Sequence, residues 1–415
     1  MTDTYQSALY TAEVFDAYEK RFAEARLNKP LRDPANAEHR AQILREAEQM
    51  LCLDQIPAPK IKILAQSDEL HGDVTVRFLQ FCSWEHCYGE ATLFLPKGYE
   101  GKKLPTVVIC NGHSAVGRMG ESYQHMAFQL AARGMAALAS DNLGHGSREV
   151  FGHGNAKAPL CSGITLQGMI VRETNAWIDW LRVQDFVDVT RLGACGNSGG
   201  GTLTLFLAAT NPHLAALASS GYPSDFSYTM LKEKKHCCCN LLRGCTNLAE
   251  MWEIYATFAP KPLLLSSGEC DRIFPANLFR RAARKVETVY RAVDAGKHFE
   301  YRLTDTKHSW EREDHLLISD FFRRHFVPDC EVRDFITYET YEPRCRFTYP
   351  ADAISTDALA VAITGRSEAL GMELEEYCPP TINGVPVDAS LLDATLFDAD
   401  PMRILAQMEF SMQNP

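Results

Sequence analysis

The sequence lacks a long hydrophobic run, an excess of basic residues and a basic, apolar N-terminal segment. Without about 18 consecutive apolar residues, no membrane-spanning helix is expected. The formal net charge of −11 argues against nucleic acid as the main partner, because a surface that binds nucleic acid needs positive charge. The first residues lack the features of a secretory signal, so we predict a cytoplasmic protein.

Periodic apolar residues predict how the chain is organised. Helical spacing predicts two helices, over residues 5–28 and 36–53. Three antiparallel strands are expected next, and from residue 106 to residue 325 short apolar strands alternate with helices. This alternation predicts an α/β fold, with a mainly parallel sheet covered by helices on both faces. Beyond Pro328 the alternation ends, and one further helix is predicted over residues 357–370.

The most informative segment has the sequence Gly196-Asn197-Ser198-Gly199-Gly200. It fits G-x-S-x-G, in which a serine occupies a sharp turn between a strand and a helix and acts as a nucleophile. A short apolar strand precedes it and an Ala/Leu-rich helix follows it. We therefore predict Ser198 as a catalytic nucleophile, against the alternative of a glycine-rich turn with a capping serine.

A serine nucleophile needs a general base, and the base needs an acid that orients it. In folds with this turn the chain order is serine, acid, histidine. Asp271 follows a late strand and is preferred as the acid over Glu269 in the same loop. His308 follows the next strand and is predicted as the base. His298 precedes that strand, whereas the base is expected to follow it, so His298 is not preferred.

The oxyanion of such a reaction needs two backbone N–H donors. One should be Gly199, the residue after the nucleophile. The other should come from the loop after the strand at residues 106–110, where His113 and Ser114 are the candidates. The alternative is that this loop is a simple turn.

Cysteine is plentiful, with 14 residues. Because a cytoplasmic protein is predicted, reduced thiols are expected rather than disulfides. Cys237, Cys238 and Cys239 are adjacent, and Cys245 is near. Adjacent cysteines fit zinc poorly, because structural zinc sites favour C-x₂-C spacing. No metal is therefore predicted, and His236 is expected to line a substrate pocket.

Taken together, these segments resemble the α/β-hydrolase superfamily, and within it the branch related to acetyl xylan esterases and dienelactone hydrolases. The resemblance covers roughly residues 95–327 and rests on residues 111–113 (Asn-Gly-His), 140–146, 167–169, 196–201, 260–264, 268–275 and 307–308. It implies ester hydrolysis through an acyl-enzyme, no cofactor, and the nucleophile, acid and base at Ser198, Asp271 and His308. The expected parts are an N-terminal helical extension (1–58), the catalytic domain (59–327) and an appended segment (328–415).

The resulting hypothesis is a serine carboxylic-ester hydrolase, a carboxylesterase or acetylesterase acting on acetyl or other short-acyl esters of a small molecule. The alternatives are a serine peptidase or amidase of prolyl-oligopeptidase type, a non-catalytic hydrolase-like binding protein, and a thiol or zinc sensor built on Cys237 to Cys245. The expected partner is a small-molecule ester, with no nucleic acid and no membrane, and homo-oligomerisation stays open.

Overall fold

The computed structural model describes residues 32–153, 159, 162–226, 228–229, 238–240, 242–243 and 248–365, and the backbone of two short strands, β10 (Thr381–Ile382) and β11 (Val385–Pro386). The helix predicted over residues 5–28 lies outside these ranges, as do His236 and Cys237. No described helix is both long enough and apolar enough to cross a membrane.

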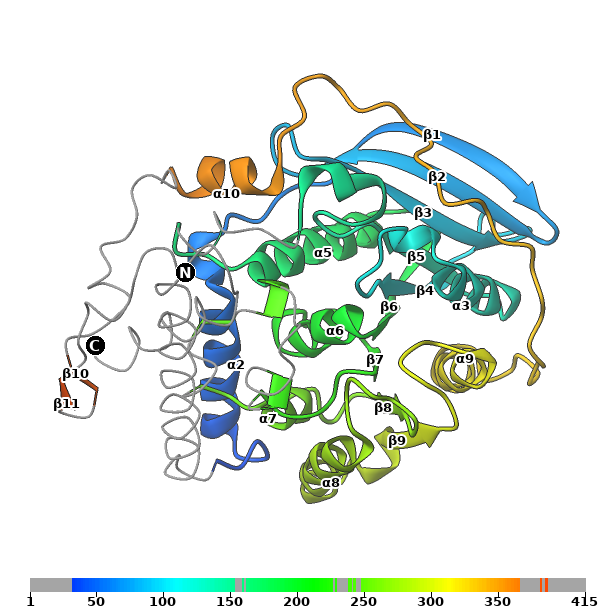
Figure 1. Cartoon of the computed structure of the whole chain (residues 1–415). Helices are drawn as coiled ribbons and strands as arrows, with labels where there is room; N and C mark the ends of the chain where they lie inside the picture. Colours follow the sequence, from blue (N-terminus) through cyan, green and yellow to red (C-terminus); the bar gives the residue numbers. More distant parts are fainter. Residues whose placement is uncertain are drawn as a thin grey trace, which may run out of the picture.

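A nine-stranded sheet forms the centre of the described chain (Figure 1). Its order is β1-β2-β3-β5-β4-β6-β7-β8-β9. Neighbours from β5 to β9 pair in parallel, whereas β1, β2 and β3 pair antiparallel and β3 joins β5 antiparallel. The strands are β1 (Lys62–His71), β2 (Val74–Cys82), β3 (Tyr88–Pro96), β4 (Leu104–Cys110), β5 (Ala136–Ser140), β6 (Val187–Asn197), β7 (Ala216–Ser220), β8 (Leu263–Gly268) and β9 (Phe299–Thr304).

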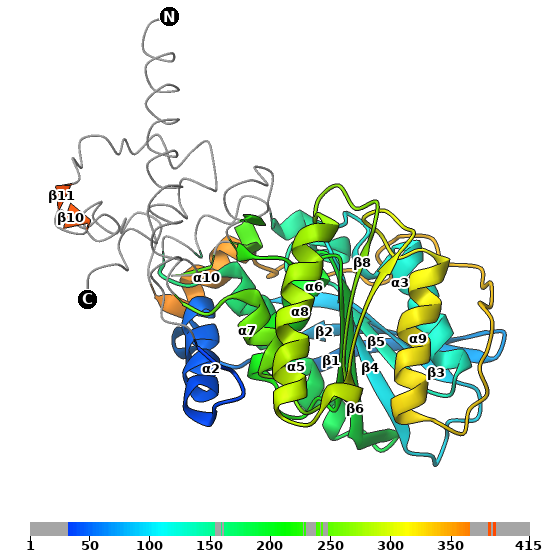
Figure 2. The same cartoon turned by 90° about the horizontal axis from the view of Figure 1, so that it is seen from below.

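Helices cover both faces of this sheet (Figure 2). One face carries α3 and α9, which contact each other, and the other carries α5, α6, α7 and α8, with α2 packed outside α6 and α7. The helices are α2 (Ala37–Leu51), α3 (Glu121–Ala132), α5 (Leu166–Arg182), α6 (Gly199–Thr210), α7 (Met251–Ala256), α8 (Ala276–Ala292), α9 (Arg312–Phe326) and α10 (Thr356–Thr364). The predicted α/β class, with a mainly parallel sheet between two helical layers, is confirmed.

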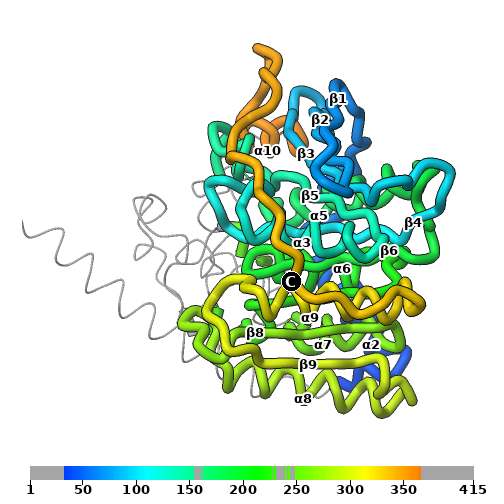
Figure 3. Tube along the Cα trace, turned by 90° about the vertical axis from the view of Figure 1, so that its right-hand side faces the viewer, coloured from blue at the N-terminus to red at the C-terminus, as the bar shows by residue number. Residues whose placement is uncertain are grey.

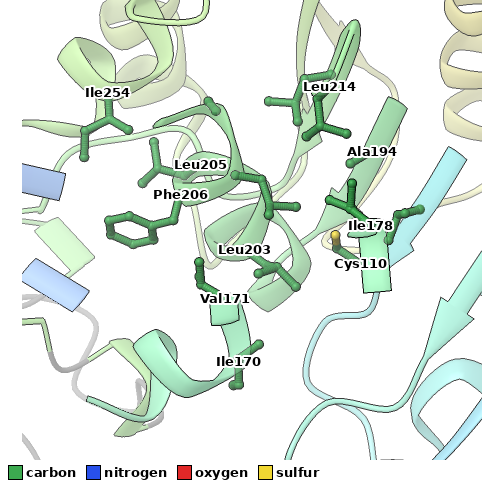
Figure 4. Close-up of a cluster of buried hydrophobic side chains, with 14 of the residues drawn as sticks. Cys110, Ile170, Val171, Ile178, Ala194, Leu203, Leu205, Phe206, Leu214 and Ile254 are labelled. Atoms are coloured by element: carbon green, nitrogen blue, oxygen red, sulfur yellow. The ribbon is translucent and has the colours of Figure 1, made fainter. Parts of the chain in front are cut away.

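The core has two parts because side chains alternate across a strand. In β4, Val107 and Ile109 pack toward α3 and α9, whereas Val108 and Cys110 pack toward α5 and α6. Figure 4 shows part of the second layer, in which Leu203 and Phe206 of α6 lie among side chains of α5 and β6. Helix α6 is buried along nearly its whole length, as expected for a helix that is apolar all round. This burial fixes the N-terminus of α6, immediately after Ser198.

The segment after α9 lies against α3 and then reaches α10 (Figure 3). Tyr338 stacks on Phe128, with ring centroids 4.4 Å apart. Gln129 Nε2 donates a hydrogen bond to the carbonyl of Ile336 at 2.7 Å. Helix α10 buries Leu359 in the same core layer as α2. This part of the appended segment is thus packed against the α/β core.

The helix predicted over residues 357–370 is shorter in the structure. It ends at Thr364, because Gly365 adopts a left-handed backbone conformation with φ of +68° and its N–H bonds to the carbonyl of Val361. Glycine in this conformation is a common helix C-terminus. The sequence prediction was therefore wrong in extending the helix past Gly365.

The buried side chain of Arg118 connects strand β3 with the loops that follow β4 and β5. Arg118 forms ion pairs with Glu90 at 2.5 Å and with Asp141, and all three side chains are at most 1% exposed. Glu90 also accepts hydrogen bonds from the backbone N–H groups of Arg346 and Phe347. The ion-pair network thereby ties the appended segment to β3.

Replacing Arg118 by methionine is expected to destabilise the protein by about 3–5 kcal/mol, because two buried carboxylates lose their partner. The matched control is Arg182→Met, which breaks the exposed pair with Asp179 and should cost no more than about 1 kcal/mol. Urea unfolding of both variants checks the difference. Equal losses in the two variants would contradict the role assigned to Arg118.

Candidate active site

Ser198 occupies the turn between β6 and α6. Its backbone has φ of +59° and ψ of −119°, a conformation that non-glycine residues rarely adopt. The neighbouring backbones are very close here, since a Cβ on Gly200 would lie 1.9 Å from the carbonyl oxygen of Cys110. Position 200 therefore requires glycine. The sharp turn and its small neighbours match those expected of a nucleophile elbow.

A hydrogen-bonded chain connects Ser198 to a buried carboxylate. His308 Nε2 lies 2.8 Å from Ser198 Oγ, and His308 Nδ1 lies 2.8 Å from Asp271 Oδ2. The Asp271 carboxylate accepts a hydrogen bond from the Nδ1–H group, which leaves the Nε2 lone pair facing the serine hydroxyl. The Asp271 side chain is 0% exposed, and its Oδ1 accepts the N–H groups of Ile273 and Phe274.

The other acids and histidines considered from the sequence lie elsewhere. Glu269 is exposed and pairs with Arg280 at 2.6 Å. His298 Nδ1 contacts the carbonyl of Pro260 at 2.8 Å. His315, inside α9, contacts the carbonyl of Ser122, and burial lowers its pKa to about 4. None of the three contacts Ser198 or His308.

The loop after β4 brings the backbone nitrogen of His113 close to Gly199. The nitrogen of His113 lies 3.5 Å from the position that a Cβ of Gly199 would take. The loop is held by Tyr123, whose hydroxyl accepts the N–H of Gly112 at 2.6 Å. Burial raises the pKa of Tyr123 to about 12, so the phenol stays protonated. This geometry favours His113 over Ser114 as the partner of Gly199.

The buried thiols near the elbow are poor candidates for the nucleophile. Burial raises the pKa of both Cys110 and Cys195, and it is the thiolate, not the thiol, that attacks. The described part of the cysteine run contributes Cys239, whose Sγ lies 3.0 Å from His113 Nε2. His236 cannot be placed, because it lies outside the described residues, and its pocket role stays a prediction.

The sequence analysis did not predict a group of three histidines beside this loop. His113, His145 and His153 each offer one ring nitrogen, and these three nitrogens lie within 4.8 Å of one another. The three residues follow different parts of the chain and have no recognised motif spacing. His145 was noted only within the resemblance at residues 140–146, and no local pattern indicated that the three histidines would meet.

The sheet order and the two helical layers define an α/β-hydrolase. Residues 90–299, about half of the chain, match the model of the Dienelactone hydrolase family. The chain therefore belongs to that family, and this membership supports an ester hydrolase.

Comparison with individual proteins supports the same α/β-hydrolase fold. The protein named "Putative hydrolase YtaP" of Bacillus subtilis (strain 168) is 25% identical over 171 residues, which are 39% of this chain and 55% of that protein. The chain thus spans about half the length of this relative. The structure of "Methylesterase BT1017" is 22% identical, with a TM-score of 0.64, over 84% of this chain and 78% of that one. A "putative acetyl xylan esterase" from Bacteroides fragilis NCTC 9343 is 15% identical, with a TM-score of 0.57, over 69% and 82%.

Proposed function

We propose that the protein is a serine carboxylic-ester hydrolase that cleaves acetyl or other short-acyl esters of a small molecule through an acyl-enzyme. The observation that carries this proposal is the chain of two 2.8 Å contacts from Asp271 through His308 to Ser198. The strained turn at Ser198 supports it, because this conformation projects Oγ from the carboxyl end of the sheet.

In the proposed reaction, Ser198 Oγ attacks the ester carbonyl while His308 Nε2 takes its proton. The carboxylate of Asp271 stabilises the imidazolium that forms. The backbone N–H groups of Gly199 and His113 donate hydrogen bonds to the oxyanion. Each such donor lowers the activation free energy by roughly 3 kcal/mol. His308 then protonates the leaving alcohol. A water molecule, deprotonated by His308, then attacks the acyl carbonyl. The bond to Ser198 Oγ breaks, His308 returns the proton to Oγ, and the free acid leaves.

The preference for a short acyl group is inferred from proteins with a similar fold. The names of two proteins with this fold refer to an acetyl ester and to a methyl ester. In the first the acid is small, and in the second the alcohol is small. We favour a small acid, so chain-length dependence on the acyl side is the decisive measurement.

With p-nitrophenyl esters, we expect kcat/KM for acetate to exceed that for octanoate by about tenfold or more, since a pocket that fits a short chain excludes extra methylenes. The matching acetanilide should be cleaved far more slowly. Ser198→Ala serves as the control for background hydrolysis. Comparable rates on the anilide would favour the amidase alternative. Absence of turnover on every ester would favour a non-catalytic binding protein.

Labelling offers a test that needs no substrate. A fluorophosphonate should modify the wild-type protein once, and peptide mass analysis should locate the adduct at Ser198, because only an activated serine attacks phosphorus quickly. The variant His308→Gln should label much more slowly at the same serine. An adduct on another residue would contradict the proposed nucleophile.

A further inference from the structure

The three histidines beside the serine loop form a compact cluster. The ring centroids of His145 and His153 are 3.8 Å apart, and those of His113 lie 5.2 Å and 5.3 Å from them. His145 and His153 are each 8% exposed, whereas His113 is exposed and leaves a route to solvent. Two imidazoles are thus almost fully buried within reach of a third.

The local backbone brings the three histidines together. His113 follows β4 and His145 follows β5, so both lie at the carboxyl edge of the sheet. Gly144 has φ of +72°, and a Cβ there would lie 2.1 Å from the carbonyl oxygen of Gly152 and 2.4 Å from Cβ of His153. Only glycine at position 144 allows the 152–153 backbone to come this close. The turn therefore brings His153 against His145.

The two ring nitrogens of His153 have different surroundings. Its Nδ1 lies 2.5 Å from the carbonyl oxygen of Leu143, so Nδ1 carries the proton and donates it. Its Nε2 is buried and has no hydrogen-bond partner among the described residues. An imidazole fixed by a backbone carbonyl on one side, with a lone pair on the other, has the arrangement of a metal-ligating histidine.

We propose that His113, His145 and His153 bind a divalent transition-metal ion, Zn²⁺ in particular. Zinc takes imidazole nitrogens at about 2.0–2.1 Å in a tetrahedral arrangement, which places neighbouring nitrogens about 3.3 Å apart. The present nitrogen–nitrogen separations are at most 4.8 Å. They shorten to about 3.3 Å when each ring moves by less than about 1 Å.

Three histidine ligands leave one position of a zinc tetrahedron for a fourth ligand, which water can supply. A small pocket at the cluster is lined by the three histidines, by Asn111, Asn142, Gln167 and Ile170, and by Gly112, Gly199 and Cys239. None of its described lining residues is a carboxylate, a lysine or an arginine. A zinc ion held by three neutral imidazoles keeps its double positive charge, which favours an oxygen ligand from water or from an anion. This position adjoins the proposed oxyanion donors.

Cys239 lies beside the cluster without completing it. Its Sγ contacts His113 Nε2 at 3.0 Å, but the group of mutually close ligand atoms contains only the three histidines among the described residues. The proposed site therefore differs both from the expectation of no metal and from the alternative of a zinc site on Cys237 to Cys245. Its ligands come from the loop after β4 and from the connection between β5 and α5 rather than from the cysteine run.

Zinc binding to the purified wild-type chain tests this proposal. After dialysis against Zn²⁺ and removal of free ion, we expect about one zinc per chain, and the Kd follows from competition with a chromogenic chelator. His145→Gln and His153→Gln should each weaken binding by more than tenfold, the smallest loss expected for an outer partner of a ligand. His298→Gln, a histidine change outside the cluster, should leave the affinity unchanged. Less than stoichiometric zinc, or equal affinity in all variants, would overturn the proposal.

A spectroscopic measurement on the wild type covers the case in which a variant fails to fold. X-ray absorption at the zinc edge should show nitrogen or oxygen neighbours at about 2.0–2.1 Å, whereas ligation by the cysteine run would give sulfur at about 2.3 Å. A sulfur shell would overturn the histidine site. Ser198→Ala should bind zinc with unchanged affinity, so the metal site and the proposed esterase activity stand or fall separately.

Discussion

Replacing Ser198 by alanine is expected to lower kcat on p-nitrophenyl acetate by about 10⁴- to 10⁶-fold, because the acyl-enzyme cannot form without the hydroxyl. The remaining backbone donors leave only weak residual catalysis. Since Oγ contributes to activity rather than to the core, circular dichroism and the melting temperature should stay close to those of the wild type.

The matched control is Ser67→Ala, which removes an exposed hydroxyl on β1 and should leave kcat unchanged. Both proteins should be assayed after active-site titration with a fluorophosphonate, so that a trace of wild-type enzyme is not mistaken for residual activity. A well-folded Ser198→Ala protein that keeps most of its esterase activity would show that another group attacks the ester.

The second large effect concerns the acid. Asp271→Asn is expected to lower kcat by about 10⁴-fold, because an amide stabilises the wrong tautomer of His308 and cannot stabilise its cation. Glu269→Gln changes the same kind of side chain two residues earlier. It should leave kcat within about threefold of the wild type, because Glu269 is engaged by Arg280 at the surface and surface ion pairs contribute little.

The ranking of these two variants decides the assignment. If Glu269→Gln lost more activity than Asp271→Asn, the acid would have to be reassigned to Glu269 and the loop would have to rearrange in solution. Measuring kcat and KM separately adds information. Loss of the acid should act on kcat, since the ground-state ester does not contact either carboxylate in the proposed reaction.

Much of the fold could be predicted because burial leaves a regular pattern in the sequence. Strand β4 and the second half of β6 are short buried runs, and β1 to β3 are bounded by turn residues, so both kinds of strand were recognised. The end of α10 was missed because apolar spacing continues past Gly365, where the backbone turns left-handed. A helix end depends on one residue's backbone conformation, which periodicity does not report.

The chain order of the candidate residues Ser198, Asp271 and His308 could be predicted from the sequence, but the contacts between their side chains could not. The serine turn carries a local signal, since Gly200 must lack a side chain wherever the chain bends this sharply. Asp271 was preferred over Glu269 from the sequence, but both follow β8 in one loop, and the sequence does not show which carboxylate reaches His308. Their separation required the direction of each side chain, which placed Asp271 against His308 and Glu269 against Arg280.

The sequence by itself determined the alternation of strands and helices and the sharp serine turn, because both are patterns of neighbouring residues. It also indicated the chain order of the candidate residues Ser198, Asp271 and His308. The tertiary structure alone decided which carboxylate faces the histidine, how the appended segment packs on α3 and that His113, His145 and His153 meet. These depend on contacts between residues far apart in the chain. Parallel strands bring the loops at their carboxyl ends to one edge of the sheet, and only there do side chains from separate loops become neighbours.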